Sequence, residues 1–170
     1  MYRPHRNPLF EEIMRRGRER SARQAFVKSD VRAMIRALRT NHLVWYAPDQ
    51  AHQRGKYSAV VPLFGIPAPT NTATSAFARL GKAPVIPFFP VRLPGAAGYR
   101  LEILPPLEDF PGADPAADAE RINRLLEERI RQCPEQYLWV HRRFKIAGAE
   151  GEDHYGPLAR KRKRKRRSSS

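Results

Sequence analysis

The chain has 170 residues, of which 41% are hydrophobic, and its formal net charge is +15 at pH 7. This length and apolar content suit one globular domain with a hydrophobic core. The longest apolar stretches, 59–69 and 83–91, are broken by prolines and fall well short of the roughly 20 apolar residues that span a bilayer, so any membrane association of this sequence is expected to be peripheral. The single cysteine, Cys133, excludes an intramolecular disulfide and a cysteine-rich zinc site.

The positive charge comes from two parts of the sequence. Residues 160–167 are all Lys or Arg and contribute +8, while the rest of the chain has 24 basic against 17 acidic residues. Both parts favour an anionic partner, which by charge alone can be a nucleic acid, anionic lipid head groups or an acidic carrier protein. Because glycine, serine and charged residues replace apolar ones from Gly148 onward, we expect a folded domain over 1–147 and a disordered basic tail over 148–170.

The N-terminal part of the sequence predicts two helices. Residues 7–22 form the first, with Pro8 near its start, acidic residues early and arginines late, an order that complements the helix dipole. The second begins after a capping Ser29 or Asp30, and its apolar residues recur at the spacing of one buried helix face. Those residues are Val31, Met34, Ile35 and Leu38.

The next segment predicts a strand that leads into a functional loop. The run 43–47 is short, rich in β-forming side chains and bounded by Pro48, which is typical of a buried strand. The polar residues 48–57 follow directly. They would lie at the C-terminal end of a strand, which is where α/β proteins usually place their functional groups.

The remaining elements alternate between helix and strand. Residues 70–82 predict a helix, and the proline-rich run 84–93 predicts an edge or bulged strand that pairs with 99–104 in a hairpin. Asp114-Pro115 marks the cap and first turn of a long helix that Pro134 ends. Helices interleaved with strands predict the α/β class, with a partial mixed sheet flanked by helices.

Six short stretches, considered together and in this order, carry a family resemblance. They are Tyr2-Arg3-Pro4 with Asn7-Pro8, Gly17-Arg18-Glu19-Arg20, Val44-Trp45-Tyr46-Ala47-Pro48-Asp49-Gln50, Val61-Pro62-Leu63-Phe64-Gly65, Val85-Ile86-Pro87-Phe88, and the run 134–145 that contains Tyr137-Leu138-Trp139-Val140-His141-Arg142-Arg143. In this order they resemble the lysophospholipid acyltransferase superfamily, and within it the lipid A lauroyl and myristoyl acyltransferases of Gram-negative bacteria. The resemblance covers about residues 1–145 and implies an acyltransferase-like fold.

The resemblance implies an acyl transfer reaction that needs no cofactor. Such enzymes move a fatty acyl chain from a thioester on acyl carrier protein to a hydroxyl of the lipid A precursor, at the cytoplasmic face of the cell inner membrane. A hydroxyl is a poor nucleophile near neutral pH, so a general base must take its proton as it attacks the thioester carbonyl. The family's base belongs to a His-x4-Asp or His-x4-Glu motif that precedes the Tyr-Arg-Pro stretch.

No histidine of this chain has an acidic residue five positions later. The histidines are His5, His42, His52, His141 and His154. The catalytic residue is therefore unknown, and we expect the N-terminal membrane-anchoring helix of the family to be missing as well. We expect a truncated form of the enzyme, peripheral to the membrane and with little activity by itself.

The resemblance also implies which residues bind the substrate. The acceptor carries phosphates and sugar carboxylates, which suit bidentate contacts from guanidinium groups. Asp49 stands where the superfamily has its Pro-Glu-Gly stretch and is expected to bind the acceptor or to order the arginines, with a turn cap as the alternative. The candidate arginines are Arg3, Arg18, Arg20 and Arg92, and their alternative is a solvated surface.

Other features have more general interpretations. We expect Trp45 and Tyr46 to lie in the core and not to contact lipid. We expect His141 to have a structural role and not a catalytic one. The composition of the tail at 160–167 favours either contact with an anionic membrane surface or a merely solubilising role. The alternative function is a basic nucleic-acid-binding module, which the charge allows but which no recognisable nucleic-acid-binding motif supports.

Overall fold

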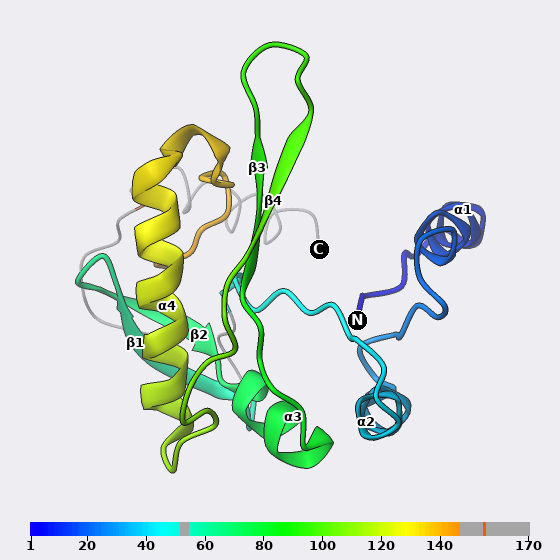
Figure 1. Ribbon diagram of the computed structural model, residues 1–170, viewed down its shortest axis with the longest axis horizontal. Coiled ribbons are helices and arrows are strands. Elements are labelled where there is room, and N and C mark those ends of the chain that lie inside the picture. Colours follow the sequence, from blue (N-terminus) through cyan, green and yellow to red (C-terminus); the bar gives the residue numbers. More distant parts are fainter. Residues whose placement is uncertain (52–54, 147–154, 156–170) are drawn as a thin grey trace, which may run out of the picture. The chain divides into compact units, whose positions relative to one another are not determined.

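The computed structural model describes residues 1–51, 55–146 and 155, which form two compact units (Figure 1). Unit 1 consists of Met1–Ala47 and Phe77–Ala83, and unit 2 of Pro48–Ala76 and Pro84–Ser170. Of the tail expected over 148–170, Tyr155 is described, while the remaining tail positions lie outside the described residues. The same holds for three residues of the expected polar loop, 52–54.

Unit 1 contains α1 (Pro8–Glu19) and α2 (Val31–Arg39), and both helices begin at a capping side chain. The Asn7 carboxamide oxygen accepts hydrogen bonds from two first-turn amides of α1, at 3.0 and 3.4 Å. Asp30, and not Ser29, caps α2 by accepting a first-turn amide at 3.1 Å. These contacts satisfy amides that a helix leaves without a partner at its start.

The N-terminal residues are tied to the segment that precedes α2. Tyr2 pairs with Val27 in a parallel bridge. The Tyr2 N–H donates to the Phe26 carbonyl at 2.8 Å, and the Lys28 N–H donates to the Tyr2 carbonyl at 2.7 Å. This pairing fixes the backbone of Tyr2 within unit 1.

The prediction of a buried strand at 43–47 is wrong. These residues have no strand partner, and Leu43 is 91% exposed. The amino group of Met1 donates a long hydrogen bond of 3.4 Å to the Trp45 carbonyl, but no ladder continues from it among the described residues. β-forming side chains make a strand only where a neighbouring strand offers a matching ladder.

The two aromatic residues of this segment differ in their environments. The Tyr46 ring packs edge-on against Phe77 with 5.3 Å between ring centroids. Trp45 is 57% exposed, so the core position expected for it is wrong. A side chain of an extended segment without a sheet is buried only where another element covers it.

Unit 2 is built on an antiparallel hairpin that the sequence did not predict. The strands β1 (Ser58–Leu63) and β2 (Ile66–Asn71) pair along their whole length. The turn between them, Phe64-Gly65, has positive φ angles of 54° and 74°, which match the twist of a two-residue hairpin turn. Because β2 reaches Asn71, the helix expected over 70–82 begins later, as α3 (Ala73–Gly81).

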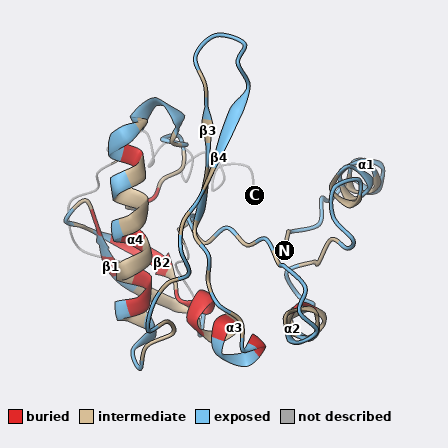
Figure 2. Cartoon of the chain, in the orientation of Figure 1, coloured by how far each residue is buried: buried red, intermediate tan, exposed pale blue. Residues whose placement is uncertain are grey.

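The helix α4 (Pro115–Gln132) packs on β1 (Figure 1). Its predicted start is confirmed, since the Asp114 carboxylate accepts the Ala116 N–H at 2.8 Å. Both the β1–β2 hairpin and α4 contain buried residues, which are red in Figure 2, and several of these are apolar. These apolar residues are Val61, Leu63, Ala68, Ala119 and Ile130.

The hairpin predicted from residues 84–93 and 99–104 is confirmed. Its strands are β3 (Phe88–Arg92) and β4 (Tyr99–Ile103), and the short helix η1 (Pro134–Gln136) follows α4. The mixture of helices and strands agrees with the α/β class. Instead of one mixed sheet, however, the described strands form two antiparallel two-stranded sheets, because each strand pairs with its sequence neighbour across a short connection.

Close packing at Gly81 leads to a stability prediction for unit 1. A Cβ at this position would lie 2.7 Å from Leu38 Cδ1 and 2.9 Å from Leu38 Cβ. We expect Gly81→Ala to destabilise unit 1 by about 1–3 kcal/mol, because side chains and backbone must shift to relieve the overlap. Urea unfolding followed by Trp45 fluorescence in a Trp139→Phe background measures the change.

Gly17→Ala is the matched control for this substitution. Gly17 lies inside α1, and a Cβ there meets no atom within 4 Å. Alanine is favoured over glycine in a helix interior by roughly 0.5–1 kcal/mol, so this variant should be at least as stable as the wild type. If Gly81→Ala were as stable as Gly17→Ala, the close approach of Gly81 to Leu38 would be refuted.

Candidate functional site

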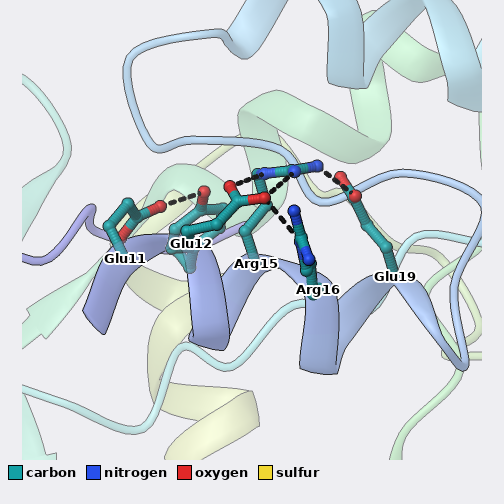
Figure 3. Close-up of polar contacts among 6 residues, drawn as sticks. Glu11, Glu12, Arg15, Arg16 and Glu19 are labelled. Atoms are coloured by element: carbon teal, nitrogen blue, oxygen red, sulfur yellow. Dashed lines mark hydrogen bonds and ion pairs between the residues drawn. The ribbon is translucent and has the colours of Figure 1, made fainter. Parts of the chain in front are cut away.

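The polar face of α1 carries a row of ion pairs, which Figure 3 shows. Glu12 accepts from Arg15 at 2.8 Å and from Arg16 at 2.6 Å, and Arg15 also pairs with Glu19. Exposed ion pairs at these helical spacings contribute little to stability, because water and salt screen them. Their main consequence here is that the cations of Arg15 and Arg16 are already engaged within the helix.

Arg18 has a different environment from these paired arginines. Its guanidinium carbon lies 4.2 Å from the centroid of the Tyr2 ring, which is a cation–π contact. One terminal nitrogen, Nη1, is buried and has no hydrogen-bond partner among the described residues. Arg18 is therefore held in a fixed orientation against the Tyr2 ring, which suits a guanidinium that binds an anionic ligand.

Tyr2, on which Arg18 rests, is itself fixed by Glu11. The Tyr2 hydroxyl donates to Glu11 Oε1 at 2.6 Å, and the His5 N–H donates to Glu11 Oε2 at 2.6 Å. The hydrogen bond from Tyr2 lowers the pKa of Glu11, and the same bond raises the pKa of Tyr2. The ring that supports Arg18 is thus oriented through a carboxylate on α1.

We expect Tyr2→Phe to return the pKa of Glu11 toward its ordinary value, because the main donor to its charged form is lost. A depressed carboxyl pKa contributes stability at neutral pH that is lost as the pH falls through the folded-state pKa. The variant should therefore lose less stability on acidification than the wild type. An NMR titration of the Glu11 side chain measures the shift, with Tyr99→Phe as the control; identical Glu11 pKa values in Tyr2→Phe and the wild type would contradict the assigned contact.

The other two N-terminal candidates, Arg3 and Arg20, are exposed. They belong to unit 1 together with Arg18. The segments of unit 1 contain 13 Lys and Arg against four Asp and Glu, whereas the segments of unit 2 without residues 160–167 contain 11 against 13. Apart from the tail, the positive excess of the chain therefore lies entirely in unit 1.

Asp49 lies in unit 2 and is exposed. The segment that carries Asp49 is bound by a residue from the C-terminal part of the chain, because the Ala51 N–H donates to His141 Nε2 at 2.8 Å. The negative charge of Asp49 also acts to raise the pKa values of Tyr137 and Arg143. The contact of His141 agrees with the structural role expected for it.

Arg143 forms the centre of a buried polar network that the sequence did not predict. The residue is 1% exposed. It donates to the Pro69 carbonyl, to Thr70 Oγ1 at 2.9 Å and to Asn123 Oδ1 at 3.2 Å. Burial lowers the pKa of Arg143, and the charges of Tyr137 and Asp49 oppose this effect. The guanidinium nevertheless remains charged, because arginine is not deprotonated in proteins.

The network links the β1–β2 hairpin to α4. Thr70 lies on β2 and donates onward to the Ala68 carbonyl at 3.0 Å. Asn123 lies on α4 and donates to the Pro62 carbonyl of β1 at 2.8 Å. Burial also raises the pKa of Tyr137, the aromatic neighbour of Arg143. The only sequence signal for the network was the arginine pair within the 134–145 stretch.

The last candidate, Arg92, lies at the end of β3 in unit 2. Its backbone exchanges two hydrogen bonds with the Gln136 side chain, at 2.8 and 3.2 Å. The two residues border an open depression that Pro94 and Glu135 also line. The structure thus gathers Arg3, Arg18 and Arg20 in unit 1, and places Asp49 and Arg92 in unit 2.

Two general features of the described residues bear on the type of site. None of their helices combines the length and the apolar character that a bilayer crossing requires. They also contain no group of three or more His, Cys, Asp or Glu side chains arranged to hold a metal ion. The charged groups that the described residues offer are mainly arginines.

Residues 1–146 match the family described as bacterial lipid A biosynthesis acyltransferase, and the chain belongs to this family. The lipid A biosynthesis lauroyltransferase of Escherichia coli (strain K12) is 43% identical over 147 residues, which cover 85% of this chain and 47% of that protein. The palmitoleoyltransferase of the same strain and an acyltransferase of Haemophilus influenzae are each 39% identical with the same coverage. The chain therefore spans about half the length of these relatives, and their names do not support the alternative of a nucleic-acid-binding module.

Proposed function

We propose that this chain acts in lipid A biosynthesis, as part of an enzyme that transfers a fatty acyl chain from acyl carrier protein to a hydroxyl of the lipid A precursor. The family match over residues 1–146 carries this proposal. The reaction would take place at the cytoplasmic face of the inner membrane, with an acyltransferase-like fold around it. The hydroxyl oxygen attacks the thioester carbonyl, its proton passes to a general base, and the thiolate of the carrier leaves.

The acceptor is the substrate that unit 1 suits best. A phosphorylated glycolipid is anionic, and unit 1 holds the positive excess of the folded sequence. Arg18 is the central candidate because its guanidinium is oriented by the Tyr2 ring. Arg3 and Arg20 would add exposed cations to the same unit, and the acidic surface of a carrier protein would be attracted by the same charge.

Asp49 and Arg92 are proposed to act from unit 2. As a carboxylate, Asp49 can accept hydrogen bonds from acceptor hydroxyls or order a guanidinium group. Arg92 can bind a phosphate or carboxylate beside the depression that it borders. The tail at 160–167, which lies outside the described residues, would add contact with an anionic leaflet, at about 1 kcal/mol per cation near the surface.

Binding of lipid A precursor in detergent micelles to the purified chain tests the acceptor assignment. We expect Arg18→Gln to weaken binding about 10-fold, since hydrogen bonds to charged groups each contribute about 1.5–3 kcal/mol. Arg16→Gln is the matched control, because Arg16 lies on the same helix but is already paired with Glu12. Dephosphorylated precursor should bind much more weakly than the phosphorylated form.

Two results would contradict the assignment. Equal weakening by Arg16→Gln and Arg18→Gln would show that only overall charge matters and that Arg18 has no specific role. Equal affinity for phosphorylated and dephosphorylated precursor would show that the arginines do not bind the phosphates.

A further inference from the structure

His141 contacts the segment that carries Asp49 from a distant part of the sequence. The Ala51 N–H donates to His141 Nε2 at 2.8 Å, across 90 positions of the chain. Because Nε2 accepts this bond, its lone pair is engaged with a backbone amide. The same lone pair cannot then accept a proton from a substrate hydroxyl, so the contact does not suit a general base.

The backbone around His141 is itself anchored. The His141 N–H donates to the Leu138 carbonyl at 3.0 Å, and the Arg143 N–H donates to the His141 carbonyl at 2.8 Å. Two positions further along, the Arg143 side chain is bound in the core to β2 and α4. The imidazole is therefore presented to Ala51 from a segment that the buried network holds.

A charge interaction also links the segment around His141 to Asp49. The negative charge of Asp49 stabilises the charged form of Arg143, two positions after His141, and so opposes the lowering of the Arg143 pKa by burial. Asp49 lies two positions before Ala51 and is exposed. A bond that fixes Ala51 consequently limits where the Asp49 side chain can lie.

We propose that His141 is a positioning residue: by accepting the Ala51 N–H, it fixes residues 48–51 and thereby holds the Asp49 carboxylate toward the acceptor. The consequence for acceptor binding rests on the function proposed above, whereas the fixing of residues 48–51 does not. The residue acts through backbone geometry and makes no contact with the reacting atoms. A side chain that offers an acceptor at the place of Nε2 should substitute for it.

Amide hydrogen exchange measured by NMR on the full chain tests this inference. His141→Phe removes the acceptor, and we expect exchange at Ala51 to rise about 5- to 10-fold while the core amide of Leu63 is unchanged. His141→Gln restores an acceptor at a similar reach and should return Ala51 exchange to within about twofold of the wild type. His42→Phe, a histidine substitution in unit 1, should leave Ala51 exchange unchanged.

The inference is overturned if His141→Phe leaves Ala51 exchange unchanged, or if Ala51 and Leu63 accelerate together and His141→Gln does not rescue them. Lipid A precursor binding supplies a separate readout. His141→Phe should weaken it several-fold and His141→Gln should not; equal affinity of these two variants would refute the link from His141 to the acceptor. A wild-type chain that binds no precursor would instead contradict the proposed function, and the exchange at Ala51 would still decide the role of His141.

Discussion

Replacing Arg143 with methionine should destabilise unit 2 by about 3–5 kcal/mol, because the substitution leaves buried polar groups without their donor. The Thr70 hydroxyl, the Asn123 amide oxygen and the Pro69 carbonyl all accept hydrogen bonds from this guanidinium. Methionine is long enough to fill most of the volume, so the loss reflects mainly the polar groups and not a cavity. β2 and α4 also lose the side chain that joins them.

The neighbouring residue gives the matched control for this substitution. Arg142 lies 5.7 Å from the Tyr155 ring in a cation–π contact, and Arg142→Met should therefore cost less than about 1 kcal/mol. Urea unfolding followed by Trp139 fluorescence in a Trp45→Phe background reports on unit 2. Equal stability of the Arg142→Met and Arg143→Met variants would show that the buried network does not stabilise the unit.

The second large effect concerns Asp49 and requires an active enzyme. In a chimera, residues 1–146 replace the matching segment of the E. coli lauroyltransferase. In this chimera, Asp49→Asn should lower the rate of acyl transfer about 100-fold, as expected when a misplaced acceptor loses its reactive geometry. The substitution keeps the size of the side chain and removes its charge, so the effect would come from lost binding or ordering of cationic and hydroxyl groups.

Asp109→Asn serves as the control for Asp49→Asn. Asp109 is exposed and has a positive φ of 49°, a conformation that asparagine adopts readily. Asp109→Asn should leave the rate of acyl transfer within about twofold of that of the unsubstituted chimera, because surface substitutions away from cores, buried networks and binding sites usually have small effects. If Asp49→Asn were as active as Asp109→Asn, Asp49 would have no role in the acceptor site.

Helix starts were the part of the fold most readily predicted from sequence. Asn7, Asp30 and Asp114 each cap a helix through a short local contact, and a local contact is visible in a local pattern. The β3–β4 hairpin was also predicted, because its strands flank a short glycine-containing connection.

The two errors in the strand predictions have different physical causes. The β1–β2 hairpin contains Pro62, Pro67 and Pro69, which obscured its alternation, yet prolines are tolerated because each strand of a two-stranded sheet has an open edge. The segment 43–47 had the composition of a strand but lacks a ladder partner among the described residues. Strand formation depends on such partners, and a single sequence does not specify them.

The candidate site residues follow from the resemblance to a family and not from local patterns, because the contacts around them join distant positions of the chain. The cation–π contact of Arg18 joins residues 16 positions apart, and the bond from Ala51 to His141 joins residues 90 apart. A fully buried arginine such as Arg143 is rare, so composition gave no reason to place it in the core. Its partners on β2 and α4 come together only in the folded unit.

Acyl transfer by the chimera described above is the most direct test of the proposed function. We predict that the purified chimera, given lauroyl-acyl carrier protein and lipid A precursor, yields precursor carrying one additional lauroyl group, as detected by mass spectrometry. Arg18→Gln in the same protein should lower the yield, and Arg16→Gln should not. A folded chimera that binds the precursor but forms no acylated product would contradict the assignment of this chain to lipid A acyl transfer.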